Sequence, residues 1–218
     1  MIKIENLEIV GWKPAIRGMR NPINSWDESD TYTTHIEDPE TLETAEYSLV
    51  VGEKDLKLMQ NLARGGGSHA KFRRMIGVYM DITAPLYWWK EFDTYKIGTV
   101  SNSCSTMHTL HKRPLQLGDF STDHLMEQSK LCLLNTINVI NYFRDEYNET
   151  GDKTYWWQMI QLLPTSFNQK RTILLNYEVL ARIYAERQNH KQDEWRRLCE
   201  WIEDLPYAQE LIINREEV

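Results

Sequence analysis

Hydrophobic and polar residues alternate along several short stretches of the chain, and a period of two is the pattern of a β-strand. The clearest case places Ile76, Val78, Met80 and Ile82 on one face. Other short stretches combine alternation or a brief apolar run with a length typical of strands. The predicted strands cover residues 1–12, 47–51, 76–82 and 172–176.

Longer stretches repeat apolar residues every three or four positions, which is the pattern of helices with one buried face. The longest predicted helix begins near Asp119, with Ser121 or Thr122 as its cap, and ends near Asn148 and Gly151. Its expected buried stripe is Leu125, Leu131, Leu134, Ile137, Ile140 and Phe143. Further helices are predicted over residues 14–20, 53–63, 153–163, 178–187, 193–203 and 207–212, and one more carries Trp88, Trp89 and Phe92.

Two features punctuate this pattern. The polar stretch from Asn21 to Glu43, with Pro22 and Pro39, is expected to be a loop. Gly65-Gly66-Gly67 stops the preceding helix without steric penalty and lets the next segment, with Ser68 and His69, approach another group closely. Helices outnumber strands without strict alternation, so the predicted class is α+β.

Composition fits one domain over residues 1–218, because this length is enough for one sizeable core. Eight Trp and eleven Tyr are unusually many. They either fill a core or a subunit interface, or stack on a flavin or a base.

A net charge of −7 argues against a long nucleic acid as partner, because such binding depends on many cations. It allows a mononucleotide, whose single phosphate needs two or three local donors. The candidate donors are Arg73, Arg74, Lys96, Arg171, Arg182 and Arg187. The alternative is that each of these side chains simply lies on a solvent-exposed surface and binds no ligand.

Three irregularly spaced cysteines do not form a disulfide framework, so the chain is expected to be reduced and cytoplasmic. No apolar run is long enough to cross a bilayer and no signal peptide opens the chain, so no membrane association is expected.

The order of parts between His69 and His108 carries the most information. A strand runs into Ala84-Pro85, an aromatic helix follows, and a loop rich in hydroxyls and amides extends from Gly98 to Thr106. This order resembles the flavin-dependent thymidylate synthases (ThyX), in which a histidine precedes the strand and the signature RHRxxSxNExSxRY follows the A-P turn. The signature falls on Thr94 to Met107 without a gap. Leu163-Pro164, Asn176 and Arg187 match later positions of the family.

The resemblance implies an α+β, ThyX-like fold with a mixed antiparallel sheet, long helices and active sites between subunits, in a homotetramer. The implied activity is transfer of a one-carbon unit from methylenetetrahydrofolate to dUMP through FAD, with NADPH as reductant. Arg187 is the implied catalytic residue, because its guanidinium would polarise the uracil ring. The implied FAD contacts are His69, Lys96, Asn102, Asn176 and Arg182, and the implied contacts to the uracil nucleotide are Glu91, Thr94, Cys104, Ser105, Thr106 and Arg187.

The signature itself is degenerate. Its Arg-His-Arg triplet is Thr94-Tyr95-Lys96, its Glu is Asn102, and its last Arg is Thr106. Losing about two charged hydrogen bonds, each typically worth roughly 1.5–3 kcal/mol, would weaken anion binding about a hundredfold or more unless other residues compensate. The alternative is therefore a non-catalytic or repurposed relative that binds a nucleotide or flavin on the same scaffold.

Two other chemistries can be drawn from the same loop. Cys104-x3-His108-x2-His111 has a spacing that could bind zinc, although a fourth ligand is missing nearby, and we assign no metal. Cys104 with a histidine base could also act as a nucleophile.

Overall fold

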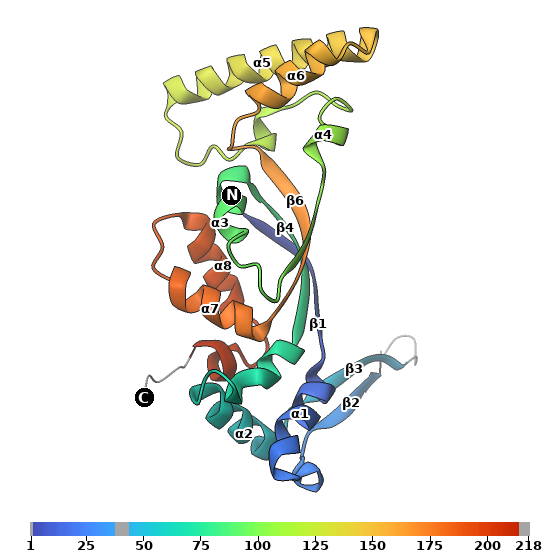
Figure 1. Ribbon diagram of the computed structural model, residues 1–218, viewed down its shortest axis with the longest axis vertical. Coiled ribbons are helices and arrows are strands. Elements are labelled where there is room, and N and C mark those ends of the chain that lie inside the picture. The colour runs from blue at the N-terminus through green and yellow to red at the C-terminus, as the bar shows by residue number, and fades with distance from the viewer. Residues whose placement is uncertain (1, 38–43, 214–218) are drawn as a thin grey trace. The chain divides into compact units, whose positions relative to one another are not determined.

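A computed structural model describes residues 2–37 and 44–213, without the side chains of residues 35–37 and 44–48 (Figure 1). The chain divides into two compact units, and each is considered by itself. The first unit comprises Met1–Leu7, Tyr79–Leu174 and Gln192–Arg197, and the second comprises Glu8–Val78, Leu175–Lys191 and Leu198–Val218. The expectation of one domain over residues 1–218 stays a prediction.

Both helices and strands contribute to the structure, which confirms the α+β class. The strands are β1 (Lys3–Val10), β2 (Tyr32–Glu37), β3 (Thr44–Val50), β4 (Gly77–Pro85), β5 (Val100–Ser103) and β6 (Asn168–Asn176). The α-helices are α1 (Trp12–Arg20), α2 (Glu53–Arg64), α3 (Leu86–Phe92), α4 (Thr106–Thr109), α5 (Glu127–Thr150), α6 (Lys153–Leu162), α7 (Tyr177–Arg187) and α8 (Asp193–Glu203). Shorter helical turns are η1 (Asn21–Ile23), η2 (Trp26–Glu28), η3 (His69–Met75), η4 (Leu117–Asp119) and η5 (Gln209–Ile213).

A four-stranded sheet has the order β1-β4-β6-β5, and β2 pairs with β3 in a separate antiparallel ribbon. The alternation predicted for β4 is confirmed, because Val78, Met80, Ile82 and Ala84 are almost fully buried. At the edge of the sheet, β5 pairs antiparallel with β6, with Ser101 opposite Ile173. All four residues of β5 are exposed, so this edge strand presents its polar side chains to the surroundings.

Tryptophans build the core beside the sheet in the first unit. Trp88 lies 4.9 Å from Trp89 and 4.8 Å from Trp195, measured between ring centroids, and Phe92 stacks on Trp195. The indole of Trp89 donates to the carbonyl of Gln169 at 3.0 Å. The core interpretation of the tryptophans is therefore confirmed for these three rings, which bury large areas.

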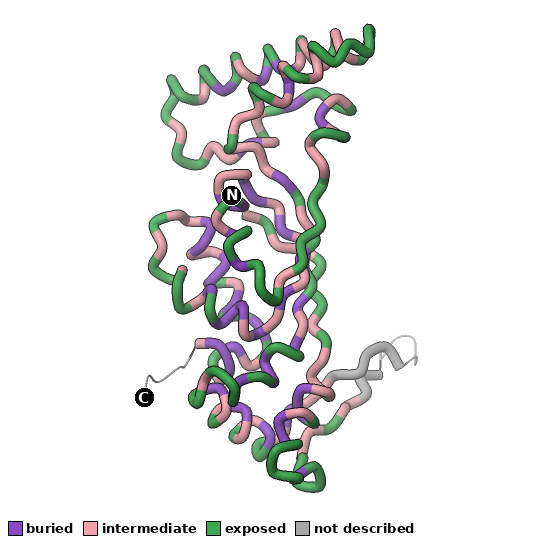
Figure 2. The backbone as a smooth tube through the Cα atoms, viewed as in Figure 1, coloured by how far each residue is buried: buried purple, intermediate pink, exposed green. Residues whose placement is uncertain are grey.

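The predicted helix from Asp119 is correct in existence and wrong in its start. Phe120 forms a β-bridge with Phe167, and the N–H of Ser121 donates to Ser166 at 2.8 Å, so this stretch is extended and α5 begins only at Glu127. Ile137 and Ile140 are buried against α6, whereas Leu131 and Leu134 are 54% and 37% exposed. Figure 2 shows α5 exposed or half-buried along most of its length. The buried stripe is thus narrower than the sequence predicts.

Helices form most of the second unit, where α7 packs against η3 and η5, and α2 against η3. Arg73 is 1% exposed, pairs with Glu178 at 2.5 Å and donates to the carbonyl of Leu211 at 2.9 Å. Because its guanidinium binds these partners inside the unit, Arg73 has a structural role and is a poor candidate for a hydrogen-bond donor to a phosphate.

Two predicted loops contain strands. The stretch from Asn21 to Glu43 holds β2, whose pairing with β3 no local pattern reveals, and its residues 38–43 lie outside the described part of the chain. The loop from Gly98 to Thr106 contains β5. β2 pairs with β3, the next strand in sequence, whereas β5 pairs with the distant β6. In both cases strand pairing decides the structure, so the prediction of a loop from local composition is wrong.

Candidate functional site

The polar segment from Lys96 to Thr106 follows the tryptophan core directly and lines two hollows of the first unit. The first, here the Lys96 hollow, has a volume of about 420 Å³ and includes Tyr95, Lys96, Thr99 and Ser101 in its lining. Lys96 is exposed and forms no ion pair within the described residues. The hydroxyl oxygen of Thr99 is buried and has no hydrogen-bond partner there. Asp93 also lines this hollow, with its carboxylate paired with Arg171 at 2.8 Å. The ammonium of Lys96 and the unsatisfied hydroxyl of Thr99 are suited to an anionic group.

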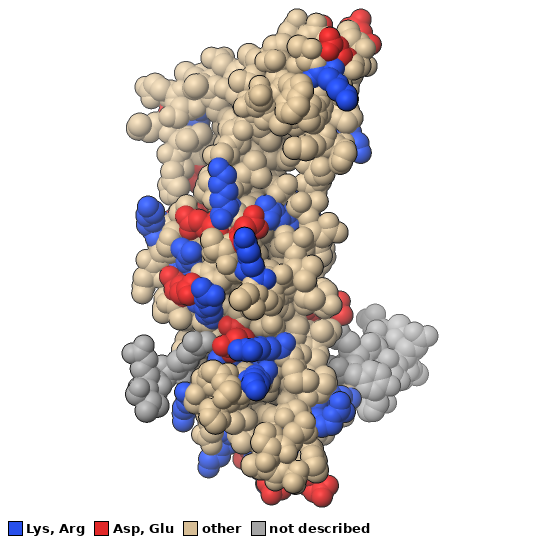
Figure 3. Space-filling view, in the orientation of Figure 1, with Lys and Arg blue, Asp and Glu red and all other residues tan. Residues whose placement is uncertain are grey.

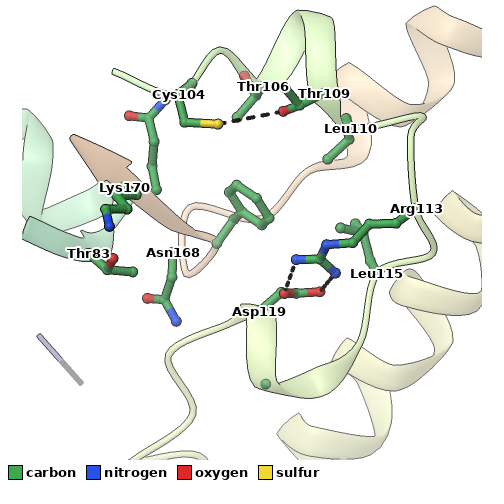
Figure 4. Close-up of a pocket in the computed structure, with 13 residues that line it drawn as sticks. Thr83, Cys104, Thr106, Thr109, Leu110, Arg113, Leu115, Asp119, Asn168 and Lys170 are labelled. Atoms are coloured by element: carbon green, nitrogen blue, oxygen red, sulfur yellow. Dashed lines mark hydrogen bonds and ion pairs between the residues drawn. The ribbon is translucent and has the colours of Figure 1, made fainter. Parts of the chain in front are cut away.

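The second hollow, here the Cys104 pocket, has a volume of about 360 Å³ (Figure 4). Cys104 comes from the end of β5, Thr106 and Thr109 from α4, and Lys170 from β6. Figure 4 shows Arg113 and Asp119 joined to one another on the side of the pocket opposite Lys170. Hydroxyls, a thiol, amides and cations therefore surround one space.

Backbone contacts hold Cys104 in place at this pocket. Its N–H donates to the carbonyl of Lys170 at 2.9 Å, and its carbonyl accepts from the side-chain amide of Gln169 at 2.9 Å. Its Sγ lies 3.9 Å from the hydroxyl of Thr109, its only hydrogen-bonding contact through the thiol in the described residues. No histidine of the described residues hydrogen-bonds to this thiol, and nucleophilic chemistry at Cys104 stays a prediction.

Arg113 and Asp119 form a two-pronged ion pair, with nitrogen–oxygen distances of 2.8 and 2.5 Å. Burial acts to raise the pKa of Asp119, but the Arg113 guanidinium and the N–H of Gln116 outweigh it and hold that pKa below its usual value. The carboxylate therefore stays charged at neutral pH, and the pair presents a fixed wall to the pocket.

Lys170 links the Cys104 pocket to a polar network on the sheet. Asp81 of β4 accepts from the hydroxyl of Thr172 at 2.6 Å and from Asn6 at 2.8 Å, and it pairs with Lys170 at 3.0 Å. These hydrogen bonds lower the pKa of Asp81 to about 2, the bond from Thr172 having the largest effect. Sequence reasoning missed this network, although Asp81 is the one charged position in an otherwise apolar alternating strand and could have signalled it.

Two of the predicted substrate contacts lie beside the tryptophan core. Glu91 accepts a hydrogen bond from the indole of Trp195 at 3.0 Å, and the hydroxyl of Thr94 donates to the carbonyl of Glu91 at 2.7 Å. Tyr95, at the second position of the degenerate triplet, is 3% exposed and packs on Trp195 at 5.8 Å. Its ring therefore belongs to the core.

The remaining first-unit predictions fall on or beside β5. Asn102 is an exposed residue of β5, opposite Thr172. Ser105 precedes α4 as its cap residue, and its carbonyl accepts from Thr109 at 2.7 Å. Thus Lys96 and the pair Cys104 and Thr106 line hollows, whereas Asn102 and Ser105 flank them along the same segment.

Four predicted residues lie in the second unit. Asn176 caps α7 by accepting from the N–H of Val179 at 3.1 Å, and Arg182 pairs with Glu186 at 2.8 Å. His69 is exposed at the start of η3, with its Cβ and ring beside Gly65, where an added Cβ would meet it at 3.3 Å. The absence of a side chain at Gly65 leaves room for His69. The predicted close approach of this segment to another group stays a prediction.

Arg187 is half-buried at the end of α7. Burial raises the pKa of the Cys199 thiol to about 12, Glu203 and Glu200 add to this rise, and Arg187 opposes it. The guanidinium therefore lies close enough to Cys199 to influence its charge.

A nucleic acid, a metal ion or a membrane would each require a particular distribution of charge, of metal-binding side chains or of apolar helices. On the face seen in Figure 3, basic and acidic side chains are interspersed, without the basic stripe that a nucleic-acid backbone requires. In residues 2–37 and 44–213, no three histidine, cysteine or acidic side chains are grouped to hold a metal ion. Within the same residues, no helix is long and apolar enough to cross a membrane.

The fold is similar to that of solved flavin-dependent thymidylate synthases and of a UMP/dUMP methylase, which confirms the ThyX-like fold. The chain is similar to thymidylate synthase X from Helicobacter pylori, crystallised with FAD and dUMP, with a TM-score of 0.70 and 14% identity, covering 98% of each chain. It is also similar to the UMP/dUMP methylase PolB from Streptomyces cacaoi, bound with 5-Br UMP, with a TM-score of 0.64 and 14% identity, covering 100% of this chain and 96% of the other. No protein-family model and no curated protein sequence matches the chain.

Proposed function

We propose that this protein binds FAD and a uracil mononucleotide and transfers a one-carbon unit from methylenetetrahydrofolate to dUMP, with NADPH as reductant. The observation that carries the proposal is the combination of a ThyX-like fold with two open hollows at the segment aligned with the family's signature. Among the neighbours with this fold, one is a ThyX crystallised with FAD and dUMP and another is a UMP/dUMP methylase bound with 5-Br UMP. A flavin and a uracil nucleotide are therefore the ligands to test first.

The residues at the Lys96 hollow fit an anionic part of FAD. The free ammonium of Lys96 and the unpartnered hydroxyl of Thr99 would hold phosphate oxygens, with the hydroxyl of Ser101 beside them. Asn102 follows on the exposed face of β5, and His69, Asn176 and Arg182 complete the proposed FAD contacts. Bound FAD would supply the redox chemistry that carries the one-carbon unit.

The Cys104 pocket is the proposed place of the uracil nucleotide. Thr106 and Thr109 offer hydroxyls, and the buried side-chain oxygen of Asn168 has no hydrogen-bond partner in the described residues. An unsatisfied acceptor beside a pocket costs free energy until a donor reaches it, and the ring N–H of uracil is such a donor. Cys104, Ser105, Glu91 and Thr94 are the further proposed contacts to the nucleotide.

Arg187 is the proposed catalytic residue. Its guanidinium would stabilise the negative charge that develops on the uracil oxygens when carbon 5 becomes electron-rich. Arginine suits this task because it stays charged and offers several N–H donors in a fixed plane. Because ThyX-type sites draw on several subunits, we further propose a homotetramer of one-domain chains (residues 1–218) in the cytoplasm.

Hydrogen exchange at carbon 5 of dUMP tests this function. Protein incubated with FAD, NADPH, methylenetetrahydrofolate and dUMP deuterated at carbon 5 should release deuterium to water, as measured by mass spectrometry of the nucleotide. A protein that binds both FAD and dUMP yet retains all the deuterium would contradict the enzymatic proposal.

A specific set of contacts favours the second candidate, a relative that binds nucleotide or flavin without turnover. Tyr95 is buried in the core, Arg182 is paired with Glu186, and Arg73 is paired with Glu178. Fewer cations are thus free for an anion than in the family's signature. Binding of FAD and dUMP without deuterium release is the outcome that this candidate predicts.

A further inference from the structure

A third hollow, in the second unit, has a volume of about 380 Å³ and takes no part in the proposed function. Its lining includes Lys13 and Arg17 of α1 and Leu49 of β3. Between them it is lined by Trp26, Ser29, Thr31, Tyr32 and Thr33. We call it the α1 hollow. Its size lies within the range of small-molecule sites, which are usually preformed.

A buried ion pair fixes the floor of the α1 hollow. Arg20, 3% exposed, donates through Nε to Asp55 at 2.6 Å and through Nη1 to the hydroxyl of Ser25 at 3.0 Å. Asp55, fully buried, also accepts from the hydroxyls of Ser29 at 2.6 Å and Thr31 at 2.7 Å. Burial acts to raise the pKa of Asp55, but these hydrogen bonds outweigh it and keep that pKa below its usual value. The carboxylate is therefore charged at neutral pH, and its hydrogen bonds tie the segment from Ser29 to Thr31 to α2.

The rim of the α1 hollow carries two exposed cations. Lys13 and Arg17 lie four positions apart on α1, and neither forms an ion pair within the described residues. Like charges at this spacing repel one another and slightly destabilise the helix. Among the described residues, none that lines the hollow is acidic, although Asp27, Glu28 and Asp30 lie in the same stretch of chain and the whole chain carries a net charge of −7. An anion bound between the two side chains would remove the repulsion.

Aromatic rings stand beside these cations. Trp26 is 48% exposed, and its indole N–H donates to the side chain of Asn21 at 2.8 Å, which orients the ring. Tyr32 is 56% exposed. Large exposed rings in a hollow are suited to stacking on a flat ligand, because every nucleobase offers a π-face.

We propose that the α1 hollow binds a nucleoside monophosphate, with the phosphate at Lys13 and Arg17 and the base stacked on Trp26 or Tyr32. A phosphate monoester carries a charge of about −1.5 to −2 at pH 7, which matches two cations. All the residues involved belong to the second unit. Nucleotide binding at the α1 hollow therefore does not depend on the proposed catalysis at dUMP.

Fluorine NMR of protein labelled with 5-fluorotryptophan tests the proposal. The spectrum should contain eight resonances, and Trp26→Phe identifies that of Trp26. Titration with AMP, GMP, CMP and UMP should shift the Trp26 resonance saturably for at least one nucleotide, and the matching nucleoside should bind at least tenfold more weakly. If none of the four moves the Trp26 resonance at millimolar concentration, the proposal is wrong.

A pair of double variants locates the phosphate. Lys13→Gln with Arg17→Gln should weaken nucleotide binding at least tenfold, because two charged contacts are lost. The matched control is Lys57→Gln with Lys71→Gln, which removes the same charge from exposed positions of the same unit outside the hollow and should leave affinity within twofold. Equal weakening by both double variants would overturn the assignment. The other seven resonances report whether the fold is intact, and deuterium release from dUMP reports separately on the proposed catalysis.

Discussion

Two regions of the first unit, the tryptophan core and the polar segment that follows α3, differ sharply in side-chain burial and in how many polar groups have partners. Trp88, Trp89 and Trp195 are at most 1% exposed and pack ring against ring. Shortly after the helix that carries two of these rings, Lys96 is exposed and unpaired in the described residues, and the buried hydroxyl of Thr99 is unsatisfied.

The difference explains how a chain can share the ThyX-like fold although its polar segment departs from the family's signature. Substitutions that change side-chain volume in a close-packed core destabilise the fold. The strand, turn and aromatic helix that build this core are therefore constrained by packing. A substitution in an exposed segment changes the free energy of unfolding little. Residues of such a segment that contact a ligand can therefore vary without loss of the fold. The core should therefore control stability, and the polar segment should control ligand binding.

The largest expected effect concerns the core. Trp195→Ala should lower the free energy of unfolding by about 3–5 kcal/mol, because it leaves a cavity among three aromatic rings. Trp157→Ala is the matched control, since this tryptophan is 50% exposed in the same unit, and it should cost about 1 kcal/mol or less. Urea denaturation at one fixed protein concentration measures both. Equal losses would erase the contrast between packed and open regions.

The next effect concerns the proposed chemistry. Arg187→Gln should lower the rate of deuterium release from dUMP by about 10²–10³-fold, the usual effect of removing one group that stabilises developing charge. The same variant should change the unfolding midpoint little, because Arg187 is only half-buried. An unchanged rate would exclude Arg187 from the reaction.

A smaller effect is expected at the polar segment. Lys96→Gln should weaken FAD binding about tenfold or more, because a hydrogen bond to a charged group contributes about 1.5–3 kcal/mol. Lys90→Gln, an exposed change on α3 outside both hollows, serves as control and should not alter the affinity. Fluorescence titration with FAD measures both constants, and identical constants would show that the Lys96 hollow does not hold the cofactor.

The smallest effect is a pH dependence at the sheet, where the charged form of Asp81 is favoured. Its pKa falls from 3.8 to about 2 on folding, so the carboxylate contributes stability that is present above pH 4 and lost as the pH falls toward 2. The difference in stability between the protein and Asp81→Asn should therefore be constant near neutral pH and shrink between pH 4 and pH 2. A difference that grows on acidification would contradict the network around Asp81.

Local pattern predicted the elements whose partners lie close in sequence or whose periodicity is strong. β4 and α3 follow from alternation and from Ala84-Pro85. The abundance of tryptophan left two interpretations open, and the structure selects the core for Trp88, Trp89 and Trp195. β5 and the extended stretch at Phe120 could not be predicted, because each pairs with a segment far along the chain. β2 pairs with β3, the next strand in sequence, and was missed because the polar residues and prolines of its stretch favour a loop.

The candidate site divides in the same way. Lys96, Cys104 and Thr106 could be selected from one continuous segment, and the structure places them at hollows. Lys170, Arg113 and Asp119 were missed because only the fold brings them to the Cys104 pocket. Asn176 matched a family position, yet its side-chain oxygen caps α7, a role that a capping preference alone also explains.

The central claim is that this scaffold still holds a flavin, and visible absorption tests it most directly. Protein incubated with FAD and then freed of unbound cofactor by gel filtration should retain the absorption bands of oxidised flavin, and Lys96→Gln should retain less. Colourless protein after the same treatment, with all the flavin in the small-molecule fraction, would contradict the claim.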